Sequence, residues 1–481
     1  MSPEETSDLN KLFYPKNVAI VGSSPKRGFI WSSGNAYISG CIKQSFQGKL
    51  FPVHPKAKSI LGFKCYKNIR EIPEEIDLVI FCIPSSAALE VMEDCGKKRV
   101  KFVHLLTAGF SETGRDEHAD MERQLVEAAK KYGIRIVGPN CMGLYCPEGG
   151  LSWNGEMPDK IGKVGLFSQS GQLANMIVMA CAPQDIFFSK VVSFGNACDI
   201  QPHEYLSYMA ADEKTDIICA YLEGVKYGRE FFEEAKKITR IKPLIVWKGG
   251  QTEGGSRATQ SHTAAMAGSI RIWEAMCKQA GIISVNSLNE MAHTVSALKR
   301  MSLPKGTNVA ILGGAGGGSV TMTDIAEKQG LRVPHLEEKT IKSLEEFVPL
   351  QGSSAKNPLD ILPHLRSPES FQKLMTLLKE DSNIDALIFA INIGFFYRDT
   401  GRTGVNLYLR MILKSMEHLK KPVFLVCETF KNFELMALQY DSDEWLAKHN
   451  VATFSSFESA AITLINLKQY SDFLNNSGTE K

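Results

Sequence analysis

The feature of this sequence that most constrains its fold is a regular alternation of short apolar runs with longer amphipathic stretches. In the first third of the chain, the apolar runs are NVAIVG (17–22), GKLFPV (48–53), DLVIFCIP (77–84), FVHLLTAG (102–109) and IRIVGPN (134–140). The segments between them, such as 86–99 and 116–133, have a helical pattern. Strands that are apolar on both faces and alternate with helices are typical of a buried parallel sheet. The pattern therefore predicts a doubly wound α/β domain.

The same pattern begins again twice further along the chain. The second set of predicted strands lies at 163–171, 189–196, 217–224, 242–250 and 281–285, and the third at 308–316, 331–334, 386–394, 421–428 and 451–456. Segment 146–160 is rich in glycine and proline and is predicted to be a linker. A length of 481 residues also suits about three domains, since a domain has roughly 100–200 residues. We therefore expect three α/β domains in succession.

Composition excludes several classes of protein. The chain is 44% hydrophobic and 22% charged, as in an ordinary globular protein, and its net charge of +2 does not favour nucleic acid or an anionic membrane. No apolar run approaches the about 20 residues that a membrane span needs, and the start MSPEETSDLN is unlike a signal peptide. The eleven cysteines form no CxxC pair, so we expect free thiols and no metal site on this chain. A cytoplasmic location is expected.

In open parallel sheets, ligands bind beyond the carboxyl ends of the strands. The first predicted strand leads into VGSSPKRG (21–28), in which a glycine allows a tight turn and the following amides can face a phosphate. This loop lacks the GxGxxG fingerprint of dinucleotide-binding folds. The loops VHPK (53–56), CIPSS (82–86) and TAGF (107–110) leave the same edge of the predicted sheet. Several loops around one crevice favour a nucleotide-containing ligand over a simple Gly-Ser turn.

Two further strand ends are candidate phosphate sites. In FSQSGQLA (167–174) a strand ends in small hydroxyl residues before a helix, whose free amides and dipole suit a phosphate. Ordinary helix capping is the alternative for this segment. The glycine-rich turn LGGAGGGSV (312–320) offers a second amide-lined site. Two such helix N-termini could hold one phosphoryl group at the two ends of its path.

Two titratable residues complete the candidate site. Glu223 follows the apolar run IICAYL, and a carboxylate at such a strand end could orient an imidazole for attack. A glutamate in a surface loop is the alternative. His262 lies among small residues in SHTAAMAGS, which leave its ring accessible, although a single histidine is more often structural.

Taken together, these segments resemble the α subunit of ADP-forming acyl-CoA synthetases, the acetate–CoA ligase branch of the succinyl-CoA synthetase superfamily. The resemblance extends from about Leu12 to about Leu467. It rests on NVAIVGSS, LFPVHPKAKSILGFKCY, GPNCMGLYCP, FSQSGQLA, SFGNACDI, YLEGVKYGREF, SHTAAMAGS and KNPLDIL, in that order.

The resemblance implies a fold and an activity for each part of the chain. It implies a Rossmann-like CoA-binding domain at 8–147, a succinyl-CoA synthetase-like flavodoxin domain at 158–300 and a second flavodoxin-like ligase domain at 305–473. It also implies interconversion of acyl-CoA, phosphate and ADP with carboxylic acid, CoA and ATP through an acyl phosphate and a phosphohistidine. Nothing in the sequence is typical of an ATP-grasp domain. The resemblance therefore implies a separate ATP-grasp β subunit that binds Mg²⁺ with ATP or ADP, and an oligomer.

The resemblance also assigns site residues. It implies that His262 is phosphorylated and that Glu223 stabilises the phosphohistidine. The residues implied to bind CoA are Gly22, Ser23, Ser24, Lys26, Pro55, Lys56, Ile83, Pro84, Ala108, Gly109, Phe110 and Asn140. Those implied to bind phosphate are Ser168, Gln169, Ser170, Gly171, Gly316, Gly317 and Gly318.

Two other functions remain open at this point. One is a CoA-dependent acyltransferase or CoA-transferase on the same scaffold, which would not need His262. The other is a CoA- or dinucleotide-sensing protein, which would not need two phosphate sites. An NAD dehydrogenase is disfavoured, because GxGxxG is missing and the second strand leads into VHPK rather than an acidic residue.

Overall fold

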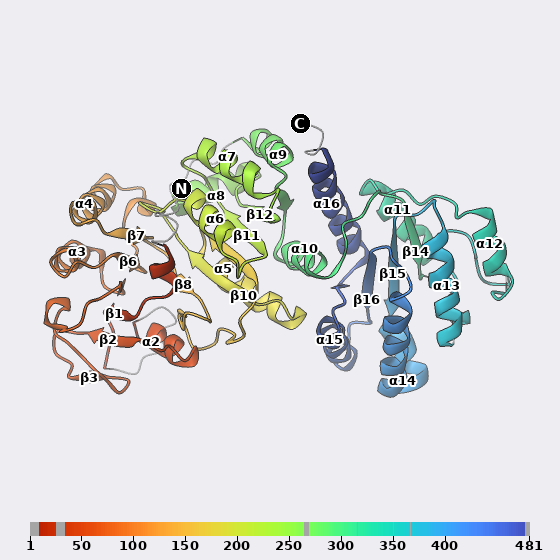
Figure 1. Cartoon of the computed structure of the whole chain (residues 1–481), viewed down its shortest axis with the longest axis horizontal. Helices are drawn as coiled ribbons and strands as arrows, with labels where there is room; N and C mark the ends of the chain where they lie inside the picture. The colour runs from red at the N-terminus through yellow and green to blue at the C-terminus, as the bar shows by residue number, and fades with distance from the viewer. Residues whose placement is uncertain are drawn as a thin grey trace. The chain divides into compact units, whose positions relative to one another are not determined.

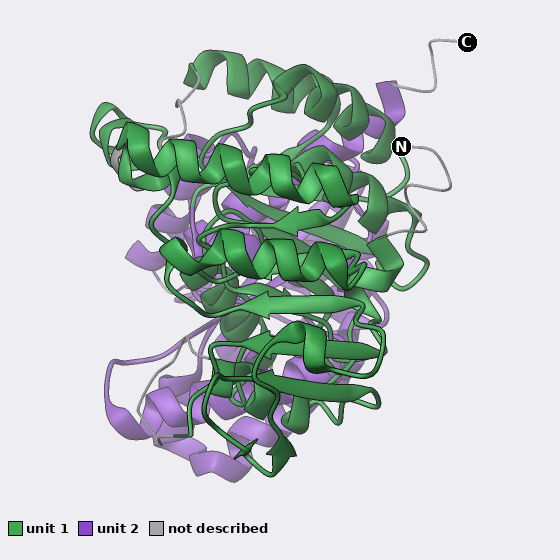
Figure 2. Cartoon of the chain, turned by 90° about the vertical axis from the view of Figure 1, so that its left-hand side faces the viewer, with its two compact units in different colours: residues 1–182, 187–286 green, residues 183–186, 287–481 purple. Residues whose placement is uncertain are grey.

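The computed structural model describes residues 9–25, 34–263, 269–314, 316–349, 351–365 and 367–476, without the side chains of 260–263. The chain forms two compact units (Figures 1 and 2). The first comprises Met1–Ala182 with Phe187–Asn286, and the second comprises Pro183–Ile186 with Ser287–Lys481. The first unit contains two parallel-type sheets and the second contains one.

The first sheet is formed by the five strand segments that the alternating pattern predicts. Its strands, in spatial order, are β2 (Lys49–Val53), β1 (Asn17–Val21), β5 (Leu78–Phe81), β6 (Phe102–Leu105) and β7 (Arg135–Val137), all parallel. Its helices are α2 (Gly34–Lys43), α3 (Ala88–Lys97) and α4 (Asp116–Tyr132), and β3 (Ser59–Ile60) and β4 (Phe63–Lys64) form a small separate hairpin. The central strand β1 pairs on both sides, with Ala19 opposite both Phe51 and Val79. Counted along the chain, this strand order is 2-1-3-4-5, an order found in doubly wound folds.

The second sheet has the same order with one added edge strand. Its strands are β13 (Ile283–Val285), β12 (Leu244–Lys248), β11 (Ile217–Leu222), β9 (Val164–Ser168), β10 (Phe188–Ser193) and β8 (Gly143–Tyr145), of which only β8 is antiparallel. Its helices are α5 (Gly171–Cys181), α6 (Pro202–Ala211), α7 (Gly228–Ile238), α8 (Glu253–Thr263) and α9 (Ile270–Ala280). The side chains of β9, β10 and β11 are all buried, as a two-sided parallel sheet requires.

The predicted linker at 146–160 is instead a packed part of the first unit, so that prediction was wrong. Trp153 is completely buried and its indole Nε1 donates to Asn175 Oδ1 at 3.2 Å. Gly40 of α2 packs so tightly on the segment that a Cβ there would lie 2.4 Å from the carbonyl oxygen of Ser152. Glycine and proline marked turns here, but the buried aromatic ring between them makes the segment part of the core.

The third sheet has helices on both faces. Its parallel strands are β14 (Val309–Leu312), β15 (Ala386–Asn392), β16 (Val423–Glu428) and β17 (Thr453–Phe454). The helices of the second unit are α10 (Leu288–Arg300), α11 (Gly317–Lys328), α12 (Glu338–Glu345), α13 (Pro368–Glu380), α14 (Ile393–Met416), α15 (Phe433–Lys448) and α16 (Phe457–Asn476). Leu387 and Phe389 of β15 belong to one apolar cluster, and Ala386 and Ile388 belong to another on the opposite face. The strand predicted at 331–334 is wrong: only an isolated bridge between Asn308 and Arg332 occurs there.

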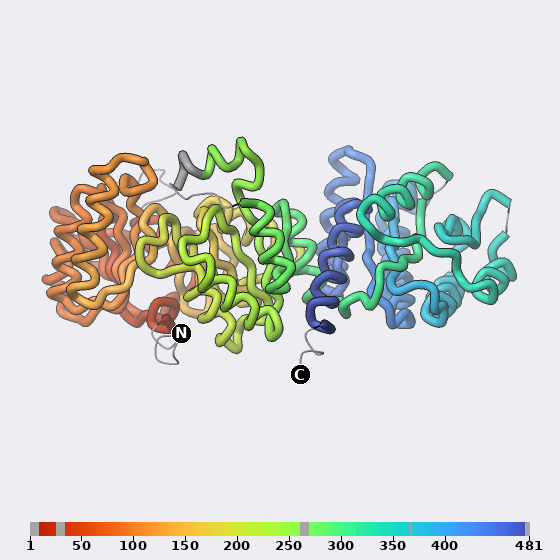
Figure 3. Tube along the Cα trace, turned by 90° about the horizontal axis from the view of Figure 1, so that it is seen from above, coloured from red at the N-terminus to blue at the C-terminus, as the bar shows by residue number. Residues whose placement is uncertain are grey.

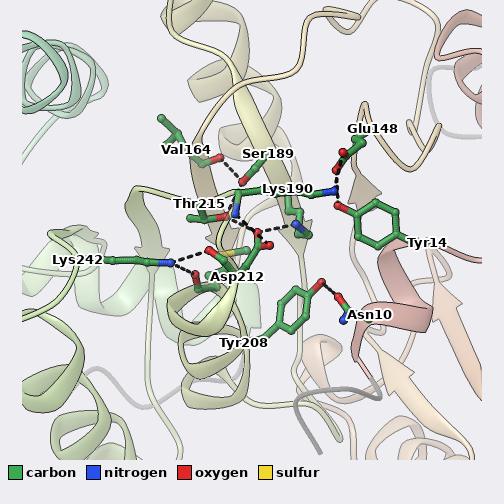
Figure 4. Close-up of polar contacts among 12 residues, drawn as sticks. Asn10, Tyr14, Glu148, Val164, Ser189, Lys190, Tyr208, Asp212, Thr215 and Lys242 are labelled. Atoms are coloured by element: carbon green, nitrogen blue, oxygen red, sulfur yellow. Dashed lines mark hydrogen bonds and ion pairs between the residues drawn. The ribbon is translucent and has the colours of Figure 1, made fainter. Parts of the chain in front are cut away.

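Figure 4 shows a buried ion pair that anchors the second sheet. Lys190 of β10 is completely buried, and its Nζ lies 2.5 Å from Asp212 Oδ2. Thr215 Oγ1 donates to the same carboxylate oxygen at 2.7 Å, and the rings of Tyr14 and Tyr208 lie within 6 Å of the ammonium. Burial acts to raise the pKa of Asp212, but the hydrogen bonds from Lys190 and Thr215 hold it below its ordinary value. The pair connects the second sheet with the N-terminal segment.

A second buried carboxyl group, Asp443 of α15, lacks such compensation. Burial raises the pKa of Asp443 to about 7, although a hydrogen bond with Thr453 acts in the opposite direction. Among the described residues, its Oδ1 has no hydrogen-bond partner. The carboxyl group is therefore more easily ionised in the unfolded chain. As the pH rises and that ionisation begins, the free energy of unfolding decreases.

We expect Asp443→Asn to stabilise the second unit in a pH-dependent manner. Below about pH 4 the carboxyl group is protonated in both folded and unfolded chains, so the gain is small. Between pH 4 and 7 the gain grows, because only the unfolded wild-type chain ionises, and it reaches up to about 4 kcal/mol above pH 7. Urea unfolding across this range measures the difference. The exposed Asp441→Asn is the control, and an Asp443→Asn gain that does not change with pH would refute the assignment.

Candidate active site

The loops predicted to bind CoA meet at the carboxyl edge of the first sheet. Gly22 follows β1 with φ +98°, and a Cβ there would lie 2.1 Å from the carbonyl oxygen of Cys82, so only glycine fits. Thr107 Oγ1 donates to the carbonyl of Ile83 at 2.8 Å, and the Asn140 amide donates to the carbonyl of Thr107 at 2.9 Å. The loops after β1, β5, β6 and β7 are thereby tied together. The predicted residues Pro84, Ala108, Gly109 and Phe110 lie in these connected loops.

The segment after Gly22 lies against the start of α2. Ser23 is buried, and a Cβ at Gly34 would come within 2.4 Å of its Oγ. Ser24 N–H donates to Asn35 Oδ1 at 2.9 Å, and Asn35 Nδ2 donates to the Ser24 carbonyl at 2.8 Å. Within the described part of the chain the buried Ser23 hydroxyl has no hydrogen-bond partner. Lys26 lies outside the described residues.

The loop after β2 carries the remaining predicted CoA residues, Pro55 and Lys56. The amides of Lys56 and Ala57 both donate to His54 Nδ1 at 3.1 Å, which fixes the turn. The Lys56 side chain is exposed beyond this turn. A cationic side chain at the edge of the crevice suits a phosphate of CoA.

At the first predicted phosphate site, two serines form hydrogen bonds around the start of α5. Ser170 is the N-cap of α5 and its Oγ accepts from the Leu173 amide at 3.3 Å, while Ser168 Oγ donates to the Ser170 carbonyl at 2.7 Å. Gly171 opens the helix against Met142, where a Cβ would lie 2.3 Å from the Met142 Cγ. Ordinary capping and a phosphate site thus share the same residues, since a helix N-terminus has more amide donors than one cap can satisfy.

Glu223 is held rigidly beside this helix start. Gln169 Oε1 accepts from the amides of Glu223 at 2.8 Å and Gly224 at 3.1 Å, which ties the end of β11 to the end of β9. Glu223 is only 6% exposed, and Tyr221 donates its hydroxyl to Glu223 Oε1 at 3.3 Å. Lys248 Nζ donates to the Glu223 carbonyl at 2.6 Å. Burial lowers the pKa of Lys248, and the negative charge of Glu223 acts against that shift.

His262 lies in the last turn of α8, the helix that follows β12. Its backbone is helical, and its side chain lies outside the described residues, so the pairing of Glu223 with His262 stays a prediction. The helix packs against the 3₁₀ turn Ser111–Thr113, which directly follows the TAGF loop. Figure 3 shows α8 (light green) reaching from the second sheet toward the first (orange). The structure thus brings the helix of the predicted phosphate carrier to the predicted CoA loops.

The second predicted phosphate site already accommodates a carboxylate. Gly316 N–H donates to Asp360 Oδ2 at 3.1 Å, and Gly317 and Gly318 form the first turn of α11. Asp360 and Asp324 both line a surface pocket of about 410 Å³ at this helix start. Two carboxylates beside the amides disfavour a bare phosphate there, so a proton, a cation or a movement of Asp360 must accompany phosphate binding.

Sequence reasoning missed several residues of this region. Tyr221 and Lys248 belong to the apolar strands β11 and β12, and neither was predicted as a site residue. The one sequence signal for them is that each is a polar side chain near the end of a strand. Asn196 in SFGN and Asp360 in KNPLDIL lay in quoted segments but received no role. In the described ranges, no three His, Cys, Asp or Glu residues are close enough to hold a metal ion. No described helix has both the length and the apolar character for crossing a membrane.

Comparison with known proteins decides the family. The family described as "CoA binding domain" matches residues 16–147, and "Succinyl-CoA ligase like flavodoxin domain" matches 161–298. The α subunit of ADP-forming acetate–CoA ligase II of Pyrococcus furiosus is 40% identical over 79% of this chain and 81% of that protein. The chain belongs to the family of ADP-forming acyl-CoA synthetases.

Other family members show the same relationship over different lengths. ADP-forming acetate–CoA ligase I of Archaeoglobus fulgidus is 37% identical over 79% of this chain, which spans only 54% of that enzyme. The solved structure of a dinucleotide-forming acetyl-coenzyme A synthetase 1 from Ca. Korarchaeum cryptofilum, in complex with phosphate and ADP, has a TM-score of 0.82 at 29% identity. The structural match covers 98% of this chain and 99% of the solved chain. The predicted fold class and family are confirmed, and with them the enzyme class of acid–thiol ligases.

Proposed function

We propose that this chain catalyses the CoA-dependent half of an ADP-forming acyl-CoA synthetase reaction, with His262 as the phosphate carrier. The observation that carries this proposal is the pair of hydrogen bonds from the Glu223 and Gly224 amides to Gln169 Oε1, which hold Glu223 beside the start of α5. It places a buried carboxylate beside a helix N-terminus suited to phosphate, next to the strand from which α8 leads to His262. The family membership supports coenzyme A as the substrate.

The proposed reaction has three steps. A phosphate oxygen attacks the thioester carbonyl carbon, the C–S bond breaks, and CoA leaves as a thiolate that takes a proton. A ring nitrogen of His262 then attacks the phosphorus of the acyl phosphate, and the carboxylate leaves with the electrons of the P–O bond. Finally, an oxygen of the ADP β-phosphate attacks the phosphohistidine, which forms ATP and restores the neutral imidazole. Each step is reversible.

The residues of this chain supply positioning and electrostatic stabilisation. Glu223 holds the proton on the far ring nitrogen and stabilises the cationic phosphoimidazole. Ser170, Gly171 and the first amides of α5 offset charge on the transferring phosphoryl group. The remaining predicted CoA and phosphate residues are proposed in the roles that the resemblance implies. A partner ATP-grasp subunit is proposed to bring ADP with Mg²⁺, in keeping with relatives named as α subunits.

The three ranges 8–147, 158–300 and 305–473 are proposed as the functional domains, and the matches at 16–147 and 161–298 support the first two. The acyltransferase and sensor alternatives predict no covalent phosphate on the chain.

A cytoplasmic location is proposed, where CoA and ADP are both supplied.

The test is phosphorylation of the isolated chain. We expect labelled phosphate plus a suitable acyl-CoA from a panel to give an acid-labile, base-stable label and to release one CoA thiol per label. Acyl-CoA without phosphate is the control and should release no thiol. If CoA binds but no acyl-CoA yields label, even with an ATP-grasp partner added, the proposal fails.

A further inference from the structure

Three polar side chains join the two sheets of the first unit beside the proposed site. Asn196 lies in the loop after β10, and its Nδ2 donates to Glu112 Oε2 at 2.7 Å and to Glu122 Oε2 at 2.9 Å. Glu112 belongs to the 3₁₀ turn after β6, and Glu122 belongs to α4. One amide of the second sheet is thus bonded to two carboxylates of the first. Asn196, Glu112 and Glu122 together form an inter-sheet clamp.

Glu112 holds the backbone of the TAGF loop, and Glu122 holds Ser111, the residue that follows the loop. Glu112 Oε1 accepts from the Gly109 amide at 2.5 Å and from the Phe110 amide at 3.2 Å. Glu122 Oε2 accepts from Ser111 Oγ at 2.7 Å. Because the Gly109 and Phe110 amides are already bonded, these residues can meet CoA only through their other atoms. The clamp therefore fixes the backbone conformation of the loop.

The loop that carries Asn196 is held independently of its side chain. The amides of Asn196 and Cys198 donate to the carbonyls of Pro139 and Gly138, each at 3.0 Å. Gly195 lies so close that a Cβ would be 2.1 Å from the Pro139 carbonyl oxygen. A change of the Asn196 side chain should therefore leave the loop backbone in place. It alters the clamp and two weaker bonds, from Asn196 Nδ2 to Ser111 Oγ at 3.3 Å and from Asn140 Nδ2 to Asn196 Oδ1 at 3.5 Å.

The clamp also faces the helix of His262. Helix α8 packs against the 3₁₀ turn Ser111–Thr113, which contains Glu112. We propose that Asn196 is a positioning residue, which through Glu112 and Glu122 fixes the TAGF loop, and with it the thioester of bound acyl-CoA, relative to α8. This inference rests on the proposed function. Its physical basis is that displacements of about 1 Å at a reacting group can cost roughly 100-fold in rate.

The chemistry of the clamp suggests a selective way to break it. Asn196→Asp replaces the shared donor with a third carboxylate within hydrogen-bonding distance of the other two, and like charges at that distance repel. A second change, Glu112→Gln, restores a donor, because its amide nitrogen in the Oε2 position can bond to the new carboxylate. Its oxygen in the Oε1 position still accepts from the Gly109 and Phe110 amides, and only the bond from the Phe110 amide to Oε2 at 3.1 Å is lost. If Asn196 only filled space, Glu112→Gln would not recover the activity that Asn196→Asp loses.

The experiment compares two sources of label for His262. The first is labelled phosphate with the acyl-CoA of the panel that labels best. The second is the labelled acyl phosphate of the same acyl group without CoA, which bypasses the thioester. We expect Asn196→Asp to slow the first reaction by roughly 10- to 100-fold and the second by less than about 2-fold, with part of the loss recovered in E112Q/N196D. The matched control is Asn68→Asp, at a surface pair in which Asn68 Nδ2 donates to Glu71 Oε1 at 3.2 Å.

The outcomes separate this inference from the proposed function. If Asn196→Asp slows both reactions equally, or neither, the positioning role is wrong. CoA binding, measured by calorimetry on the same samples, should weaken in N196D and partly recover in E112Q/N196D. If the wild-type chain takes no label from either source, the phosphohistidine proposal fails, and the clamp is then judged by CoA binding alone: an unchanged dissociation constant in N196D overturns it.

Discussion

Replacing Glu223 with glutamine is expected to slow phosphate transfer to and from His262 by about 10²- to 10⁴-fold. This range extends from the loss of one electrostatic contact to a transition state to the loss of the carboxylate partner of a catalytic imidazole. The amide keeps nearly the same shape but cannot stabilise the positive charge that develops on the ring. Single-turnover labelling from acyl-CoA and phosphate measures the loss.

The structure makes this substitution a clean one. Gln169 binds the Glu223 and Gly224 amides, and Lys248 binds the Glu223 carbonyl, so the backbone is held without the carboxylate. A glutamine Oε1 still accepts from Tyr221. Glu230→Gln, a change of the same kind at an exposed position seven residues further along, should leave the rate unaltered. Full activity in E223Q would show that the carboxylate does not serve His262.

Replacing Lys190 with alanine is expected to lower the free energy of unfolding of the first unit by about 3–5 kcal/mol. The substitution leaves Asp212 charged in a buried setting, with Thr215 as its remaining side-chain donor in the described network. It also removes the ammonium from beside the Tyr14 and Tyr208 rings (Figure 4). Urea unfolding is followed by tryptophan fluorescence in a Trp445→Phe background, because the four remaining tryptophans all belong to this unit.

Two comparisons isolate the effect of burial. Lys163→Ala breaks a neighbouring lysine–aspartate pair, Lys163 with Asp216 at 3.1 Å, whose side chains are 70% and 54% exposed. Its cost should be below about 1 kcal/mol. The double variant K190M/D212L removes both buried charges and should be more stable than K190A. Equal costs for K190A and K163A would contradict the view that the buried pair anchors the sheet.

The strands and their ends could be predicted because both are local properties of the sequence. Apolar runs marked nearly every strand of the three sheets, and the residues that follow them fall at the carboxyl edges where ligands bind. Ser170 and Glu223 were found in this way, since helix caps and polar strand ends leave a signal within a few residues.

The parts that could not be predicted depend on residues far apart in the sequence. Trp153 sits in a segment with turn composition, and its burial against α5 is a tertiary contact. Asp360 reaches the start of α11 from 44 positions away, and Asn196 reaches Glu112 across 84. Lys190 appeared as a polar interruption in an apolar strand, because its partner Asp212 is brought to it only by folding. The local hydrophobic pattern of a sequence contains no information on contacts between residues so far apart.

The position of the phosphate on the labelled chain decides whether His262 is the phosphate carrier. Protein labelled with acyl-CoA and phosphate is digested under mildly basic conditions that preserve phosphohistidine, and its peptides are sequenced by mass spectrometry. We expect a single phosphorylated residue, His262, and complete loss of label in His262→Ala with CoA binding retained. Label on another residue, or undiminished label in His262→Ala, would contradict it.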